Sequence, residues 1–140
     1  MRGRRVGTER GSASLELALI TPALLVVLLF VVGLGRLSEA RMDVDGAAAQ
    51  GARAASVARS PTAARNAASD AASGELAGRS LACSSLDVAV DTTGFHPGGQ
   101  VVVDLTCTVS LSSLGGFALP GSKTLRSRAV VVLDAFRGSG

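Results

Sequence analysis

The chain has 140 residues, which is enough for one small domain and an apolar anchor. Its 14 basic and 11 acidic side chains give a net charge of +3, but four arginines and one glutamate lie within residues 1–11, so the remainder nets zero. That distribution argues against a nucleic-acid-binding surface. Four Phe and no Trp or Tyr leave few platforms for stacking bases or sugars, and we expect neither a nucleic-acid partner nor a small-molecule substrate.

The N-terminal part combines a basic leader, residues 1–11, with a run of 19 residues from Leu17 to Gly35 that has no charged side chain. As a helix this run is about 28 Å long, close to the hydrocarbon thickness of a bilayer. A helix satisfies its own backbone in lipid, so the sequence predicts a transmembrane helix over residues 12–36. Basic residues ahead of it predict a cytoplasmic N-terminus and an extracytoplasmic C-terminal domain in the cell membrane.

One carboxylate, Glu16, stands at the start of the apolar run. An acidic residue would cost roughly 2.5–3.5 kcal/mol at the bilayer centre and less at its edge. The simplest interpretation is an interfacial residue that faces the positive end of the helix dipole, which favours a negative charge by about 0.3–1 kcal/mol. The residues around Glu16 indicate a second interpretation.

Those neighbours form an ordered set of features. A basic leader precedes Gly11-Ser-Ala-Ser-Leu-Glu16, the apolar helix follows with Pro22 in its first turns, and Gly35-Arg36 closes it. This arrangement, over roughly residues 11–42, resembles the TadE-like family, which are minor pseudopilins of tight-adherence (Flp, type IVc) pilus systems. The sequence differs from the usual family pattern at Leu17, where an aromatic residue often follows the Glu, and at Leu34, where an acidic residue often precedes Gly-Arg.

The resemblance implies a processing step and a set of partners. A prepilin peptidase would cut between Gly11 and Ser12 and leave Glu16 as the fifth residue of the mature chain. Glu16 would then neutralise the new amine at Ser12, either in its own chain or in a neighbour. The implied partners are membrane lipid, the peptidase, other pilins or pseudopilins and the pilus assembly machinery, with the protein possibly entering a surface pilus.

Two alternatives remain open for the N-terminus. The first is an uncleaved signal anchor that holds an extracytoplasmic binding module, in which case the mature chain begins at Met1. The second is a secreted domain that begins at Arg41, because Ser38-Glu39-Ala40 has the small residues of an ordinary signal-peptidase site. The secreted-domain alternative is disfavoured because the apolar run is longer than the 7–15 residues usual in a signal peptide.

Residues 37–80 are predicted to be an extracytoplasmic helical region. The first helix continues past Arg36 with one face of small apolar residues at spacings of three and four: Leu37, Ala40, Val44, Ala47, Gly51, Ala54 and Ala58. This face either packs on the protein's own second helix and sheet or faces a filament. Ser60 and Pro61 predict the cap and first turn of a second helix, from about Pro61 to Leu76. Its apolar face consists of Ala64, Ala67, Ala68, Ala71 and Ala72.

Residues 81–137 are predicted to be a small sheet region, and residues 138–140 a tail. The apolar period falls to two over 86–91, 101–110 and, less clearly, 126–135. Gly- and Pro-containing loops, 92–99 and 112–122, separate these strands. The predicted fold class is therefore α+β: a long transmembrane helix continuing into a soluble helix, a second short helix, and an antiparallel sheet of about three strands, which is also the general plan of pilin-like proteins.

Two cysteines, Cys83 and Cys107, lie beyond the apolar helix. Cys107 falls on the apolar face of the clearest strand, from which it can reach Cys83 just before the first strand. An exported location and an even cysteine count favour a disulfide, and the alternative is two buried unpaired thiols.

The sequence contains no catalytic constellation, and we expect no enzyme activity and no cofactor. His96, the single histidine, has no Cys or second His at ligand spacing, which favours an exposed loop residue over a metal site. Asp87, Asp91 and Asp104 lie in predicted strands, where solvated surface is the simpler interpretation and weak calcium binding the alternative.

Overall fold

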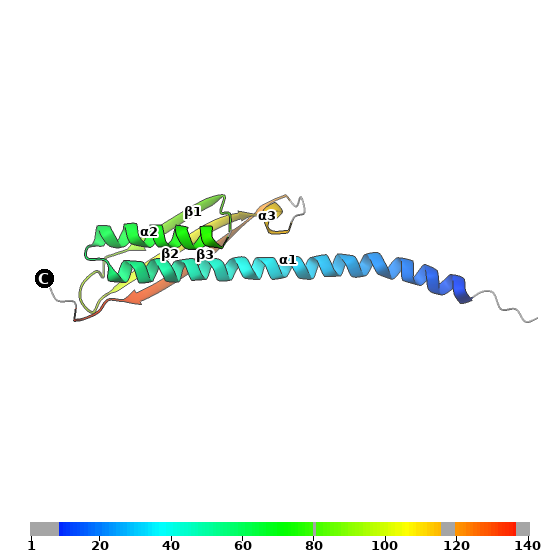
Figure 1. Cartoon of the computed structure of the whole chain (residues 1–140), viewed down its shortest axis with the longest axis horizontal. Helices are drawn as coiled ribbons and strands as arrows, with labels where there is room; N and C mark the ends of the chain where they lie inside the picture. The colour runs from blue at the N-terminus through cyan, green and yellow to red at the C-terminus, as the bar shows by residue number, and fades with distance from the viewer. Residues whose placement is uncertain (1–8, 80, 116–119, 137–140) are drawn as a thin grey trace, which may run out of the picture. The chain divides into compact units, whose positions relative to one another are not determined.

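The computed structural model describes residues 9–79, 81–115 and 120–136 (Figure 1). The elements are α1 (Glu9–Val57), α2 (Pro61–Gly78), β1 (Ser85–Asp91), β2 (Gln100–Ser110), α3 (Leu111–Gly115) and β3 (Ser122–Val132). A long apolar helix, a shorter helix and a three-stranded antiparallel sheet confirm the predicted α+β class. The predictions for the leader before Glu9 and for the 138–140 tail lie outside these residues.

The chain divides into two units between Gly35 and Arg36. Within residues 9–35, the first unit is the N-terminal part of α1 alone. The helix runs through Pro22, and the hydroxyl of Thr21 donates a hydrogen bond of 2.7 Å to the Leu17 carbonyl one turn back.

The second unit is built on the sheet, in the order β1-β2-β3. Both outer strands run antiparallel to β2. In β2 the odd-numbered residues Val101, Val103, Leu105, Cys107 and Val109 are buried, while the even-numbered residues are partly exposed. Strict alternation of this kind places one face of the sheet on the core and the other toward solvent.

Two helical segments, residues 36–57 of α1 and all of α2, cover the inner face of the sheet (Figure 1). Buried alanines and Val44 from α1 share core clusters with alanines and Leu76 of α2 and with the inner residues of β2 and β3. Ala40, Val44, Ala47 and Gly51 are therefore enclosed by the chain itself. This supports the first interpretation of the small-residue face, that it packs on the protein's own second helix and sheet.

The buried face of α1 is rotated slightly from the predicted one. Ala54 and Ala58 of the predicted face are only half-buried, whereas Ala48, Ala52 and Ala55, which were not part of that face, are buried. The helix has to contact both α2 and the sheet, so its buried stripe is broader than a single three-four row.

Gly51 of α1 lies close against α2. A Cβ atom placed on Gly51 would lie 3.0 Å from the Ala68 carbonyl oxygen and 3.5 Å from the Cβ of Ala72. Small residues at a crossing let two helix backbones approach closely, and Gly51 is the residue that this crossing requires.

The start of α2 follows the predicted cap. The Ser60 hydroxyl accepts a hydrogen bond of 3.2 Å from the Ala63 amide, and Pro61 occupies the first turn. A serine in this position satisfies one of the free amides at the helix start, and proline lacks the amide that would otherwise be unpaired there.

A disulfide joins Cys83, just before β1, to Cys107 in the buried row of β2, with 5.4 Å between the two Cα atoms. The bond that the sequence favours is therefore present. It closes a separation of 24 residues and, in the chain-entropy model, stabilises the folded unit by about 3–4 kcal/mol.

Two boundaries differ from the sequence prediction. Within the predicted 112–122 loop, Leu111–Gly115 form the short helix α3. The third strand begins at Ser122 instead of 126 and ends at Val132 instead of 135, because the long β2 extends its pairing with β3 as far as Ser110 opposite Ser122. Leu133 is still buried after the strand ends, and its amide donates to the Gly99 carbonyl at 2.8 Å.

Candidate functional site

The segment that the sequence singles out lies in the first turns of α1. Gly11 and Ser12 are the third and fourth residues of the helix, and Gly11 has no atom within 4 Å of the position that a Cβ would take. Glu16 lies one helical turn after Ser12, and side chains four residues apart share a face of a helix. A backbone amine at position 12 would therefore lie about one helical turn before Glu16 along α1.

Glu16 is exposed and forms no hydrogen bond or ion pair with another described residue. The residues that follow it are apolar and equally exposed: the large side chains between Leu17 and Leu34 retain 46–69% of their surface. Ala13–Val57 is a helix long and apolar enough to cross a membrane, and its most apolar window has no buried residue. An exposed apolar surface of this extent needs a hydrocarbon environment, and it identifies the N-terminal helix as a membrane anchor.

The alternative signal-peptidase tract lies in a different setting. Ser38, Glu39 and Ala40 are in the middle of α1, and Ala40 retains 2% of its surface in the core of the second unit. A cut after Ala40 would divide a helix whose next residues contribute to that core.

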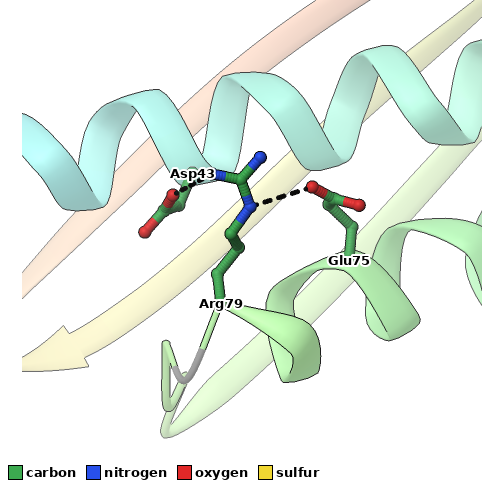
Figure 2. Close-up of polar contacts among 3 residues, drawn as sticks. All are labelled: Asp43, Glu75 and Arg79. Atoms are coloured by element: carbon green, nitrogen blue, oxygen red, sulfur yellow. Dashed lines mark hydrogen bonds and ion pairs between the residues drawn. The ribbon is translucent and has the colours of Figure 1, made fainter.

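A polar cluster ties α2 to α1 within the second unit (Figure 2). Arg79, which follows α2, donates to Glu75 at 3.1 Å and reaches Asp43 of α1 at 3.5 Å. The hollow beside this cluster is lined by two arginines, Arg36 and Arg79, and by two carboxylates, Glu39 and Asp43. Because the charged groups of this cluster pair with one another and join α2 to α1, the cluster favours a structural role.

The three predicted surface aspartates have different surroundings. Arg128 of β3 donates two hydrogen bonds to Asp104 of β2, at 2.7 and 3.0 Å, and these lower the pKa of Asp104 and raise that of Arg128. The Thr93 backbone amide donates to Asp91 at 2.9 Å and lowers the pKa of Asp91. Asp87 is exposed. In the part of the chain that the structure describes, no three His, Cys, Asp or Glu residues are grouped as a metal site would require.

The loop between β1 and β2 is held by polar contacts that sequence reasoning did not foresee. Arg65 of α2 donates to the hydroxyl of Thr92, a buried polar residue, at 2.8 Å. His96 is exposed and its Nδ1 lies 3.2 Å from the Pro97 carbonyl oxygen. The Arg65 bond connects Thr92 to α2, and neither contact brings a nucleophile or a second ligand to the histidine.

Together these features define a class of protein: a small disulfide-bonded α+β domain joined to an exposed apolar helix of membrane length. Residues 11–53 match the family model described as TadE-like protein, so this segment of the chain is similar to the TadE-like family. The matched segment contains Gly11, Ser12, Glu16, the whole apolar run and the first helical turns of the domain core. No curated protein and no solved structure gives a significant match to the chain.

Proposed function

We propose that this chain is a single-pass membrane pseudopilin that takes part in assembling a tight-adherence (Flp, type IVc) pilus, with a structural and not a catalytic role. The observation that carries the proposal is the TadE-like match over residues 11–53 together with a lone carboxylate, Glu16, at the entrance of a charge-free helix. The membrane anchor and the folded domain fit a subunit that waits in the bilayer before it joins an assembly.

The first step in this proposal is cleavage by a prepilin peptidase. Hydrolysis of the Gly11–Ser12 amide would leave a carboxylate on Gly11 and a protonated amine on Ser12. The bond lies in the first turn of α1, where helix amides have no partner within the helix, and glycine destabilises a helix by about 1 kcal/mol relative to alanine. Unwinding this turn so that it enters a peptidase is therefore inexpensive.

The second step assigns a partner to Glu16. An unpaired carboxylate is costly in lipid, and pairing with a cation reduces that cost. Cleavage would create a cation, the backbone amine of Ser12, about one helical turn away along α1. Glu16 would pair with the amine of Ser12 in its own chain while the subunit is alone, or with that of a neighbouring subunit in an assembly.

The proposed topology places the basic leader in the cytoplasm and the second unit outside. The four arginines among the first 11 residues support this orientation through the positive-inside rule. The Cys83–Cys107 disulfide also supports it, because such bonds persist in oxidising extracytoplasmic compartments.

The cleavage step is tested by the intact mass of the protein purified from membranes of cells that contain the peptidase. We expect a chain that begins at Ser12, and we expect Gly11→Arg to retain all residues of the leader. A wild-type chain that begins at Met1 would contradict the proposal and favour an uncleaved anchor carrying a binding module. A chain that begins at Arg41 would indicate a secreted domain.

The role of Glu16 is tested by the pilus yield of a Glu16→Ala strain, with Glu39→Ala as the matched control. Both residues are exposed glutamates of α1, but only Glu16 lies at the start of the apolar run. We expect Glu16→Ala to insert into the membrane normally and to lose pili, while Glu39→Ala keeps them. Normal piliation in the Glu16→Ala strain would overturn the assigned role.

A further inference from the structure

Acidic and basic residues lie in different strands of the sheet. β1 contains two acidic residues, Asp87 and Asp91, and β2 one, Asp104, with no basic residue in either strand. β3 contains three basic residues, Lys123, Arg126 and Arg128, and no acidic one. The sheet is therefore acidic at one edge and basic at the other.

These two strands are the edges of the sheet as far as the structure describes the chain. The order is β1-β2-β3, and because both outer strands are antiparallel to β2 they run in the same direction as each other. An edge strand presents unpaired backbone groups and side chains that a further strand or domain can contact.

Two opposite charges lie at the same level of these edges. Asp87 of β1 pairs in register with Thr106 of β2, and Thr106 pairs with Arg126 of β3. All three belong to the face that points away from the helices, and Asp87 and Arg126 are both exposed. Neither forms an ion pair with another described residue, whereas the neighbouring Arg128 is already bound to Asp104.

We propose that the β1 edge of one copy of this chain docks against the β3 edge of a second copy, with Asp87 of one paired to Arg126 of the other. Translating the sheet sideways by its own width brings the two residues together at the same level without rotating either strand. The contact joins two different surfaces and leaves one edge free at each end, and such a heterologous contact propagates instead of closing. This proposal rests on the proposed function, because a pilus or its assembly platform needs contacts that propagate.

A single exposed ion pair is a weak contact in solution. Copies anchored in one membrane are confined, so that each contact forms at a high effective concentration. Weak edge contacts of this kind suit subunits that associate only where they are gathered in the bilayer.

Cysteine cross-linking in the membrane tests the contact directly. The chain with Asp87→Cys and Arg126→Cys cannot bridge these positions internally, because two strand spacings separate them by about 9–10 Å and a disulfide needs Cα atoms within about 7 Å. Under mild oxidation we expect a ladder of dimers, trimers and higher species on a non-reducing gel, at least tenfold above a chain with Asp70→Cys and Arg126→Cys. Asp70 is an exposed residue of α2 and provides the matched control.

Three outcomes of the cross-linking would overturn the proposal: no multimer above the control, species that stop at the dimer, or bands that contain a different protein. A dimer alone would indicate a closed two-fold contact instead of a propagating one.

Charge reversal gives an independent test that does not depend on the new cysteines. We expect Asp87→Arg and Arg126→Asp each to reduce piliation at least tenfold, and the double variant to restore it. Co-expression of the two single variants should also restore piliation. Positions 87 and 126 are both basic in one variant and both acidic in the other, so every contact between alternating copies joins opposite charges. Asp70→Arg should leave piliation unchanged. Normal piliation in both single variants, or failure of the double variant to recover while its Cys83–Cys107 bond forms normally, would overturn the proposal.

The failure of this inference is distinguishable from the failure of the proposed function. If deletion of the whole protein leaves pili intact, the function itself is wrong. If deletion abolishes pili but positions 87 and 126 never cross-link between copies, the function holds and the edge contact does not.

Discussion

The two units of the chain use opposite kinds of side chain on the same helix. Between residues 15 and 34, α1 carries Leu, Ile, Val and Phe, which remain 46–69% exposed. From residue 40 onward its inward face is almost entirely alanine and glycine, and these residues are buried. Large apolar side chains that remain this exposed require lipid, whereas small side chains allow a second helix to approach. The contrast indicates a lipid environment around the helix of the first unit and a self-packed core in the second unit.

One of the two large expected effects comes from a charge in the middle of the apolar run. Val27 and Val57 both lie on α1, 58% and 74% exposed, but in different units. Val27→Arg should weaken membrane insertion by about 2.5–3.5 kcal/mol, because the charge lies near the middle of the apolar run. Val57→Arg should insert normally. Alkaline extraction of membranes, followed by blotting of pellet and supernatant, measures both, and equal release of the two variants would contradict the assignment.

An effect of similar size concerns the second unit alone. Replacing Cys83 and Cys107 together by alanine should lower the free energy of unfolding by about 3–4 kcal/mol, because the 24-residue separation is no longer closed in the unfolded chain. Urea-dependent proteolysis of the full-length protein in detergent measures the change. Membrane insertion of the same variant should be normal, and a loss of insertion would show that the two units are not independent in this respect.

A smaller change in the free energy of unfolding is expected from substitution of a glycine of α1, and it depends on which unit holds the glycine. Gly51→Val should destabilise the second unit by about 1–3 kcal/mol, since the new side chain meets the Ala68 carbonyl oxygen and the Ala72 methyl group. Gly33→Val, in the first unit, has open space around it and should not change unfolding. The same proteolysis assay distinguishes them, and equal stability of the two variants would show that α1 and α2 do not pack closely at Gly51.

The smallest effect is a dependence on pH. Arg128 lowers the pKa of Asp104 below the ordinary value of about 3.9. The carboxylate therefore stabilises the sheet above that pH, and the stabilisation is lost as the pH falls through the lowered pKa. Unfolding midpoints measured between pH 7 and pH 2 should fall less steeply for Asp104→Asn than for the wild type. Asp87→Asn removes an aspartate that forms no ion pair with another described residue; it keeps the Asp104–Arg128 pair and should retain the steeper dependence.

Most of the architecture was predictable because it depends on local periodicity. The 19 uncharged residues identified the anchor, Ser60-Pro61 the helix restart, and the alternation around Cys107 the central strand. The candidate processing tract was visible for the same reason, since Gly11 and Glu16 lie in one continuous stretch. The start of β3 was not predictable, because Ser122–Thr124 are polar and join the sheet only through pairing with β2.

The contacts between strands were beyond reach of the sequence alone. The Asp104–Arg128 pair and the common level of Asp87 and Arg126 depend on the register of two strand pairings, and a shift by one residue would turn each side chain to the other face. The Arg79 cluster similarly depends on where α2 crosses α1. In each case the sequence shows the residues but not the residues that they contact in the folded chain.

The alanine-rich face of α2 has a consequence for how the domain fluctuates. Its buried residues are Ala64, Ala68, Ala72 and Leu76, so the helix removes little hydrocarbon from water for its length. The amides of β2, by contrast, are paired on both sides within a row of valines and leucines. Local opening should therefore detach α2 first, and its amides should exchange with deuterium well before those of β2. Within the second unit, α2 would therefore open at a lower free energy than β2.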